Sequence, residues 1–235
     1  MSLFDNLPQG GSHPVNEQAG FAFPASLTEK YRPHTFAEFV GIEKPRRIMA
    51  NFAANPKPDA FLFVGPSGIG KTSLALAFFD AIAAELHHVP SQQCNVASLE
   101  TVIANCHRAP WNLFGPNAGK ASRFHGVLVD EAHKMGKAAQ LHLLSKLDAT
   151  AFPPSTVFIF TANSTDGLED TFISRCKLIQ FSSHGVAEET AQLLERIWER
   201  EAGQAEKPNF LRIVRDSGNN VRNALNMLET EILAA

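Results

Sequence analysis

The sequence predicts an α/β protein in which a parallel five-stranded sheet lies between helices and is followed by a small helical lid domain. Three observations support this prediction. Short apolar runs alternate with helical patterns between about residues 60 and 181, which is typical of parallel strands joined by crossover helices. A glycine-rich loop joins the first apolar run to the next helix. Beyond about residue 185 only helical patterns remain, too few to enclose a large core.

The chain is expected to consist of three parts. Residues 1–26 contain Gly10, Gly11 and several prolines with little periodicity, which predicts a flexible tail. Residues 27–183 are expected to form the α/β domain, and residues 184–235 the helical lid.

The elements are expected in the following order. The first helix covers residues 37–54 and ends before Pro56, which cannot continue it. Five apolar runs predict strands over residues 60–64, 87–92, 125–129, 156–161 and 177–181. Helical patterns lie between the strands, over residues 71–85, 97–108, 137–148 and 167–174. Residues 110–123 are rich in Gly, Pro and Asn and predict a loop. Helical patterns for the lid are expected over residues 187–203 and 210–235, with a break at Gly218 after which a new helix starts near Val221.

The composition excludes several classes of protein. Apolar residues make up 44% and charged residues 19% of the chain, as in ordinary globular proteins. The net charge of −3 excludes a polycation, so DNA contacts would need a local basic patch or a channel in an assembly. No apolar run is long enough to span a bilayer, and the N-terminus lacks the pattern of a signal peptide. We therefore expect no membrane partner and a cytoplasmic location, or a nuclear one in a eukaryote.

The cysteines and histidines give no sign of a metal site in the sequence. Cys94, Cys106 and Cys176 are widely spaced and lack the spacing of zinc ligands, so we expect reduced thiols and no disulfide framework. The nine histidines are scattered along the chain. His87 and His88, at the start of a strand, are expected to have a structural role rather than to bind a metal.

The most specific motif is the glycine-rich loop after the first strand. It has the pattern of a phosphate-binding P-loop and comprises Gly65, Pro66, Ser67, Gly68, Ile69, Gly70, Lys71 and Thr72. Its glycines let backbone N–H groups point at one oxyanion, and the helix that starts there adds a partial positive charge. Lys71 is expected to reach the terminal phosphates of a nucleoside triphosphate, and the Thr72 hydroxyl to hold Mg²⁺. Ser73 completes the predicted binding segment.

The third strand ends in two adjacent carboxylates, Asp130 and Glu131. Because side chains alternate along a strand, the two leave its tip in different directions. Asp130 is expected to hold a Mg²⁺-bound water and Glu131 to polarise the attacking water, which indicates hydrolysis rather than binding alone. The spelling Asp-Glu-Ala-His also occurs in a class of helicases, but these are expected to need a second ATPase lobe for which 235 residues leave no room.

Three further residues are candidates for the same site. Asn163 follows the fourth strand, where its amide can orient the attacking water; a turn-forming role is the alternative. Arg175 ends a short helix before the last strand, where it can reach a neighbouring subunit's γ-phosphate or cap its own helix. Arg222 lies in the first turn of a helix, where a positive charge opposes the helix dipole. This position indicates a contact with the nucleotide, and a solvated arginine is the alternative.

Taken together and in this order, the motifs resemble those of AAA+ ATPases. Residues 27–33 (Leu-Thr-Glu-Lys-Tyr-Arg-Pro), Ser174-Arg175-Cys176 and residues 220–225 (Asn-Val-Arg-Asn-Ala-Leu) are similar to signatures of clamp-loader small subunits of the replication factor C type. The resemblance covers residues 27–235. It implies that the adenine is bordered by four residues, Tyr31, Arg32, Pro33 and Val40.

The resemblance also implies roles for the residues already described. The glycine-rich loop would be Walker A, Asp130 and Glu131 Walker B, Asn163 sensor 1, Arg175 a trans-acting arginine finger and Arg222 sensor 2. The family uses ATP to open a ring-shaped sliding clamp and to place it on primer–template DNA. The resemblance therefore implies ATP and Mg²⁺ as ligands. Its implied partners are other subunits of a homo- or hetero-oligomer with shared active sites, DNA, and a sliding clamp.

Two departures from the family pattern keep alternatives open. Family members have a helical collar domain that is expected to be missing here, and Leu144 and Ser145 stand where clamp loaders carry paired arginines. One alternative is an AAA+ regulator of a phage, plasmid or transposition system; another is a nucleotide-dependent interaction module with negligible turnover.

Lys134, Lys137 and Lys146 can track DNA phosphates from the helix after Walker B, or form a solvated helix face.

Overall fold

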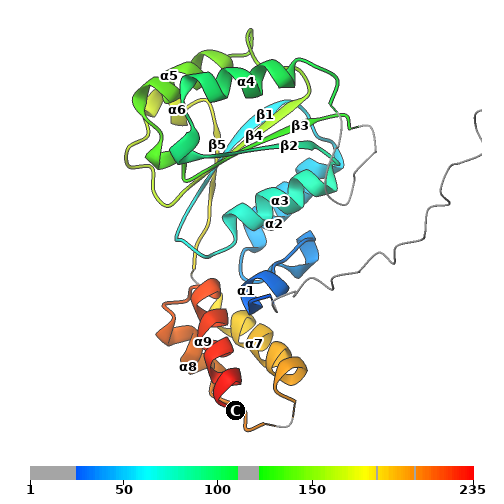
Figure 1. Cartoon of the computed structure of the whole chain (residues 1–235), viewed down its shortest axis with the longest axis vertical. Helices are drawn as coiled ribbons and strands as arrows, with labels where there is room; N and C mark the ends of the chain where they lie inside the picture. The colour runs from blue at the N-terminus through cyan, green and yellow to red at the C-terminus, as the bar shows by residue number, and fades with distance from the viewer. Residues whose placement is uncertain (1–24, 111–121, 184, 204) are drawn as a thin grey trace, which may run out of the picture.

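The computed structural model describes residues 25–110, 122–183, 185–203 and 205–235 (Figure 1). The predicted tail and most of the predicted loop over residues 110–123 lie outside this part of the chain. A layered sheet-and-helix unit forms the upper part of Figure 1, and a group of helices that includes the C-terminus lies below it. The predicted fold class, a parallel sheet between helices followed by a helical part, is confirmed.

The sheet has five parallel strands in the order β2-β3-β4-β1-β5. The strands are β1 (Asp59–Val64), β2 (Glu85–Pro90), β3 (His125–Asp130), β4 (Thr156–Ala162) and β5 (Lys177–Gln180). β1 lies in the interior, where Leu62 is paired with Phe160 of β4 and with Leu178 of β5. Because the strands are parallel, their carboxyl ends meet at one edge, which is where ligands bind in sheets of this kind.

Helices cover both faces of the sheet (Figure 1). One face carries α2 (Glu43–Ala54) and α3 (Lys71–Ala81), and the other carries α4 (Val96–Cys106), α5 (Lys137–Lys146) and α6 (Asp170–Ile173). The strand residues alternate between two cores, so that Leu128 packs on the α3 side whereas Val127 and Val129 pack on the α4 and α5 side. Each such buried side chain contributes roughly 1.5–3 kcal/mol relative to an exposed one.

The contact between β3 and α3 is unusually close at Gly126. A Cβ at this position would overlap the ring of Phe79, which is 2% exposed. The helix that follows the glycine-rich loop therefore packs directly on the strand that ends in Asp130. This packing fixes the distance between the two predicted motifs.

A third core lies among α7 (Ala187–Glu201), α8 (Phe210–Asp216) and α9 (Val221–Ala234). Trp198 and Leu228 are almost completely buried in it. The short helix α1 (Leu27–Lys30) belongs to the same core, because Leu27 is buried there and its backbone N–H donates to Glu229 Oε1 at 3.3 Å. Both ends of the described chain therefore meet in one group of helices, called the lid below.

Some element boundaries differ from the expectation. The prediction of a single helix over residues 37–54 is wrong in its first part. Phe36–Glu38 form the 3-10 helix η1, and α2 begins only at Glu43. Gly41 separates them because its φ of 71° is left-handed. β2 begins two residues earlier than expected, at Glu85, because it pairs with β3 from His125 onward. Two more 3-10 helices precede α4 and α5, η2 (Ser91–Gln93) and η3 (Ala132–Lys134).

Across the part of the chain that the structure describes, no helix combines the length and the apolar character needed to cross a membrane.

Candidate nucleotide-binding site

The glycine-rich loop lies between β1 and α3, at the carboxyl edge of the sheet. Lys71 is the first residue of α3, and its ammonium group turns back into the loop. Its Nζ donates to the carbonyl oxygens of Gly65 and Pro66, both at 2.7 Å, and to Asn163 Oδ1 at 3.1 Å. The sequence-predicted residues Lys71, at the start of α3, and Asn163, just after β4, are thus brought into contact. The loop carbonyls hold the ammonium at the place where phosphate oxygens would compete for it.

Burial changes the acidity of this lysine. Lys71 is only 7% exposed, and desolvation lowers its pKa to about 8. The positive charge of Arg222 acts in the same direction, whereas Asp130 and Glu131 oppose it. A site that lowers the pKa of a lysine in this way is one that favours a bound anion.

Asp130 lies at the tip of β3 and faces the start of α3. Its Oδ1 accepts hydrogen bonds from the hydroxyls of Thr72 and Thr161, both at 2.8 Å, and its Oδ2 lies 2.9 Å from His88 Nε2. The sequence-predicted pair of Thr72 and Asp130 is therefore in direct contact. Two hydroxyls and an imidazole together fix the orientation of this carboxylate.

Thr161 was not singled out in the sequence, and His88 was expected only to have a structural role. Thr161 is 3% exposed on β4, and its hydroxyl also accepts the backbone N–H of Glu131 at 3.1 Å. The signal that could have identified it is a hydroxyl two residues before Asn163, on the strand that neighbours the carboxylate pair. His88 is half-exposed, and its position follows from the pairing of β2 with β3.

Glu131 adopts a left-handed backbone conformation, with φ 54° and ψ 43°. This is costly for a residue with a side chain and is found mostly where function requires it. The Glu131 carboxylate Oε2 lies 2.7 Å from Lys134 Nζ. Both side chains of this pair are about half exposed, so the ion pair is weak and easily exchanged.

The lid contacts the glycine-rich loop directly. Asn220 Nδ2 donates to the Ser67 carbonyl at 2.9 Å, and the backbone N–H of Arg222 donates to the Gly68 carbonyl at 3.4 Å. Gly68 has a φ of 71°, and a Cβ there would overlap the Asn220 side chain. Asn220 Oδ1 also accepts the N–H of Asn223 at 3.2 Å, so the residue that caps α9 is also the one that joins the lid to the loop.

Two adjoining cavities lie between the sheet and the lid. The polar one, of about 450 Å³, is lined by Lys71, Thr72, Asp130, Glu131 and Asn163 among others. The more apolar one, of about 190 Å³, is lined by residues that include the four predicted to border adenine, Tyr31, Arg32, Pro33 and Val40.

The two cavities share part of their walls, formed by Arg32, Gly68, Gly70, Ser73 and Arg222. Arg32 Nε lies 3.4 Å from Ser73 Oγ, which joins the segment before η1 to α3. Polar and apolar compartments that share a wall match the phosphate and base ends of a nucleotide. The segment that carries Arg32 is anchored in turn by Tyr31, whose hydroxyl donates to Glu201 of the lid.

Arg175 lies away from these cavities. It follows α6, and its Nη1 forms an ion pair with Asp148 Oδ1 at 2.8 Å. The Arg175 side chain is 46% exposed, and it lines neither of the two cavities. Of the residues predicted to be catalytic, Lys71, Glu131 and Asn163 are brought together, and Arg175 is not.

The donor set suits a hard divalent cation. The Thr72 hydroxyl and the Asp130 carboxylate are adjacent oxygen donors at the polar cavity, and such donors are preferred by Mg²⁺. These two residues fit the predicted Mg²⁺ site, which would lie beside Lys71.

Comparison with known proteins places this geometry in context. Residues 61–184 match the family described as "ATPase family associated with various cellular activities (AAA)". The chain is 31% identical over 204 residues to replication factor C small subunit 1 of Pyrobaculum islandicum, covering 86% of this chain and 60% of that protein. It is 28% identical over 229 residues to DNA polymerase III subunit tau/gamma of Haemophilus influenzae, covering 88% and 32% respectively. The chain therefore spans less than two thirds of the length of either relative.

Solved structures agree on the architecture. The Holliday junction branch migration motor RuvB of Thermotoga maritima aligns with a TM-score of 0.65 at 17% identity, over 85% of this chain and 64% of that chain. At this level of identity the likeness establishes the fold alone.

Proposed function

Because the chain belongs to the AAA family of ATPases, we propose that it is a clamp-loader-like subunit that uses ATP to remodel a partner bound to DNA. One observation carries this proposal. Lys71, Asp130, Glu131 and Asn163 gather around one cavity, whereas Arg175 stays outside it, paired to Asp148. An active site that lacks only its arginine is the form expected when a neighbouring subunit supplies that residue.

ATP binding would use both cavities. The base and ribose would enter the apolar cavity beside Tyr31 and Val40, and the phosphates would lie over the glycine-rich loop. Lys71 would exchange the loop carbonyls for phosphate oxygens. Thr72 and Asp130 would hold Mg²⁺, which neutralises charge on the β- and γ-phosphates when bound.

Hydrolysis would require Glu131 to leave Lys134 and accept a hydrogen bond from the attacking water. Asn163 lies beside Lys71 and would orient the same water or the γ-phosphate. Arg222 lines both cavities and would respond to the loss of the γ-phosphate, so we propose that residues 184–235 act as a lid that reports the nucleotide state.

The neighbouring subunit would complete the site with its own Arg175. An arginine supplied in this way typically raises turnover by about 10³–10⁵-fold. The ion pair with Asp148 is exposed on both sides, so release of Arg175 toward a neighbour costs little.

The names of the relatives suggest the partners of this chain. Replication factor C small subunit 1 and DNA polymerase III subunit tau/gamma are both replication proteins by name, which supports DNA and a sliding clamp as partners of this chain. Lys137 and Lys146 lie on α5 and would face DNA in a ring.

A mixing experiment tests the shared site. Lys71→Ala removes the phosphate lysine, and Arg175→Ala removes the arginine finger, so each variant alone should be inactive. Mixed in equal amounts, they should recover ATPase activity, because the intact loop of one meets the intact Arg175 of the other. Arg212→Ala removes an exposed lid arginine and is the matched control, expected to keep full activity. An Arg175→Ala chain that turns over ATP at the native rate would contradict the proposal.

A second experiment tests the partner. ATP turnover by the full chain is measured with primed DNA, with a sliding clamp, and with both. The clamp-loader proposal predicts the largest stimulation with both together. If duplex DNA alone gives full stimulation and filaments or hexamers form on it, the alternative of an AAA+ regulator of a phage, plasmid or transposition system holds instead. Phosphate release no faster than that of Glu131→Gln would favour a nucleotide-dependent interaction module.

A further inference from the structure

A second group of polar side chains is buried at the other end of β3. The parallel register pairs Glu85 of β2 with His125 of β3, and side-chain alternation puts Glu85 and His87 on the same face of β2 as the buried Val89. Cys106, the last residue of α4, covers this face. His88 points to the opposite face, where it contacts Asp130. His87 and His88 therefore lie on opposite faces of β2 and belong to two different groups of side chains.

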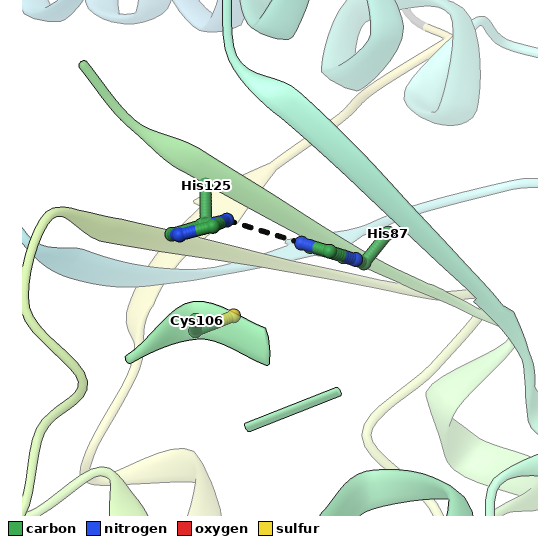
Figure 2. Close-up of side chains that lie close together, drawn as sticks. All are labelled: His87, Cys106 and His125. Atoms are coloured by element: carbon green, nitrogen blue, oxygen red, sulfur yellow. Dashed lines mark hydrogen bonds between the residues drawn. The ribbon is translucent and has the colours of Figure 1, made fainter. Parts of the chain in front are cut away.

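Three metal-binding atoms converge in this group (Figure 2). His87 Nε2 lies 3.1 Å from His125 Nδ1, and these two atoms and Cys106 Sγ all lie within 4.8 Å of one another. His125 and Cys106 are each about 1% exposed, and the His87 side chain 12%. A tetrahedral zinc ion with Zn–N bonds of about 2.0–2.1 Å and Zn–S of about 2.3 Å needs ligand separations of roughly 3.3–3.6 Å. The histidine pair already has nearly that separation, and the sulfur would have to approach by at most roughly 1.5 Å.

The hydrogen bonds of His125 fix its tautomer. His125 Nε2 lies 3.0 Å from the Arg108 carbonyl, which can only accept, so Nε2 carries the proton and Nδ1 presents a lone pair to the group. An imidazole oriented by a backbone carbonyl on its far nitrogen is the usual arrangement of a metal-binding histidine. Without a metal, His87 Nε2 donates to His125 Nδ1.

A carboxylate stands beside the three atoms. Glu85 Oε2 lies 3.5 Å from His125 Nδ1, and Oε1 lies 4.0 Å from His87 Nε2. The carboxylate therefore lies beside both imidazoles. Two imidazoles and a thiol are ligands typical of zinc, and a nearby carboxylate could complete a tetrahedral set, whereas Mg²⁺ prefers oxygen donors.

We propose that His87, Cys106 and His125 bind a zinc-class divalent cation, with Glu85 as the fourth ligand. On binding, the Cys106 thiol releases its proton to solvent and its sulfur bonds the metal as a thiolate. His87 moves its ring proton to Nδ1, so that Nε2 also bonds the metal. The ion would join β2, β3 and the end of α4, which makes it a structural site.

The proposal does not depend on the nucleotide site. His125 begins β3 and Asp130 ends it, so five strand steps, or roughly 16 Å, separate the two. The proposed ion would act as a cross-link rather than in catalysis. This agrees with the expected structural role of His87 but not with the expectation that His87 does not bind a metal.

The test uses the full chain without nucleotide, after dialysis against a chelator. Zinc is then added, excess ion is removed, and bound metal is measured by mass spectrometry. Cobalt(II) replaces zinc in a parallel sample, because its thiolate charge-transfer absorption reports a metal–sulfur bond. We expect one ion per chain, a cobalt–thiolate band, and a rise in Tm on zinc addition. Cys106→Ser and His87→Ala should each weaken binding at least about 100-fold, since even outer-shell changes cost 10–100-fold.

Matched controls separate this site from other sources of binding. Cys94→Ser changes a second buried thiol of the same core and should keep the ion. His107→Ala changes an exposed histidine next to Cys106 and should also keep it. Asp130→Asn removes the predicted Mg²⁺ ligand and should leave zinc binding unchanged.

Two outcomes would overturn the proposal. The first is that the native chain retains no zinc and gives no cobalt–thiolate band. This measurement uses no variant, so it does not depend on whether a variant folds. The other is a Cys106→Ser chain that holds zinc as tightly as the native one. In either case the histidine pair is a hydrogen-bonded part of the core.

Discussion

Replacing Asn220 by alanine tests how the lid contributes to nucleotide affinity. The Asn220 side chain makes two hydrogen bonds: Oδ1 caps α9 through the N–H of Asn223, and Nδ2 donates to the Ser67 carbonyl of the glycine-rich loop. Asn220→Ala removes both. Asn220→Ser keeps an oxygen that can cap the helix but has no amide to reach the loop.

The size of the effect follows from these two bonds. Loss of the cap costs about 1 kcal/mol of helix stability, which affects the lid but not the loop. Loss of the bond to the loop costs about 1 kcal/mol. If ATP binds tightly only when the lid is docked, the apparent Kd rises by at most a factor of about 5, because the docked fraction falls by that factor.

The assay is calorimetric titration of ATP into each variant. Asn209→Ala is the matched control, because Asn209 Oδ1 caps α8 through the N–H of Arg212 at 3.0 Å. We expect Asn220→Ala and Asn220→Ser to weaken ATP binding by the same factor, up to about 5, and Asn209→Ala to bind ATP as the native chain does. The reasoning is refuted if Asn220→Ala binds as the native chain does, or if Asn209→Ala weakens binding equally.

Further predictions concern the loop lysine, the Walker B glutamate and the core. Lys71 has a pKa of about 8 in the free protein, so it is half deprotonated at pH 8. Because bound phosphate raises that pKa, ATP binding should take up about half a proton per chain at pH 8 and almost none near pH 6.5. Calorimetry in buffers of different ionisation enthalpy measures this, and uptake that does not change with pH would contradict it. Glu131→Gln should lower turnover at least about 100-fold with ATP binding kept, whereas Lys134→Ala, which frees Glu131, should raise basal turnover up to about fivefold. Phosphate-release assays decide both, and a Glu131→Gln chain with native turnover would remove the proposed base. Gly126→Ala, which overlaps Phe79, should cost about 2 kcal/mol and lower Tm by about 4–8 °C in a thermal melt; an unchanged Tm would show that the contact relaxes.

Much of the fold and the phosphate site could be predicted because their determinants are contiguous in sequence. A strand, a glycine-rich loop and a helix follow one another, so residues 65–72 can be located without knowledge of the rest. Asp130 and Asn163 follow strands, and parallel strands bring their carboxyl ends together. The roles of these residues remain predictions, although the structure places them around one cavity.

Contacts that depend on strand register could not be predicted in the same way. Thr161 reaches Asp130 only because Val129 pairs with Phe160, and His125 meets Glu85 only because β2 begins two residues earlier than its apolar pattern indicates. The pairing of Arg175 with Asp148 depends on how α5 and α6 pack. A one-residue change in the register of the strands would turn the strand side chains named above to the opposite face of the sheet. The sequence pattern is compatible with either register.

The lid is built from both ends of the described chain, and this has a mechanical consequence. The chain leaves the lid after Tyr31 and returns to it after Phe181, so two covalent segments connect the lid to the sheet. A body tied to another at two points turns most freely about the line through those points. We therefore expect opening of the nucleotide cleft to be mainly a rotation about one axis, in which α7 to α9 would swing along one arc rather than loosen in every direction.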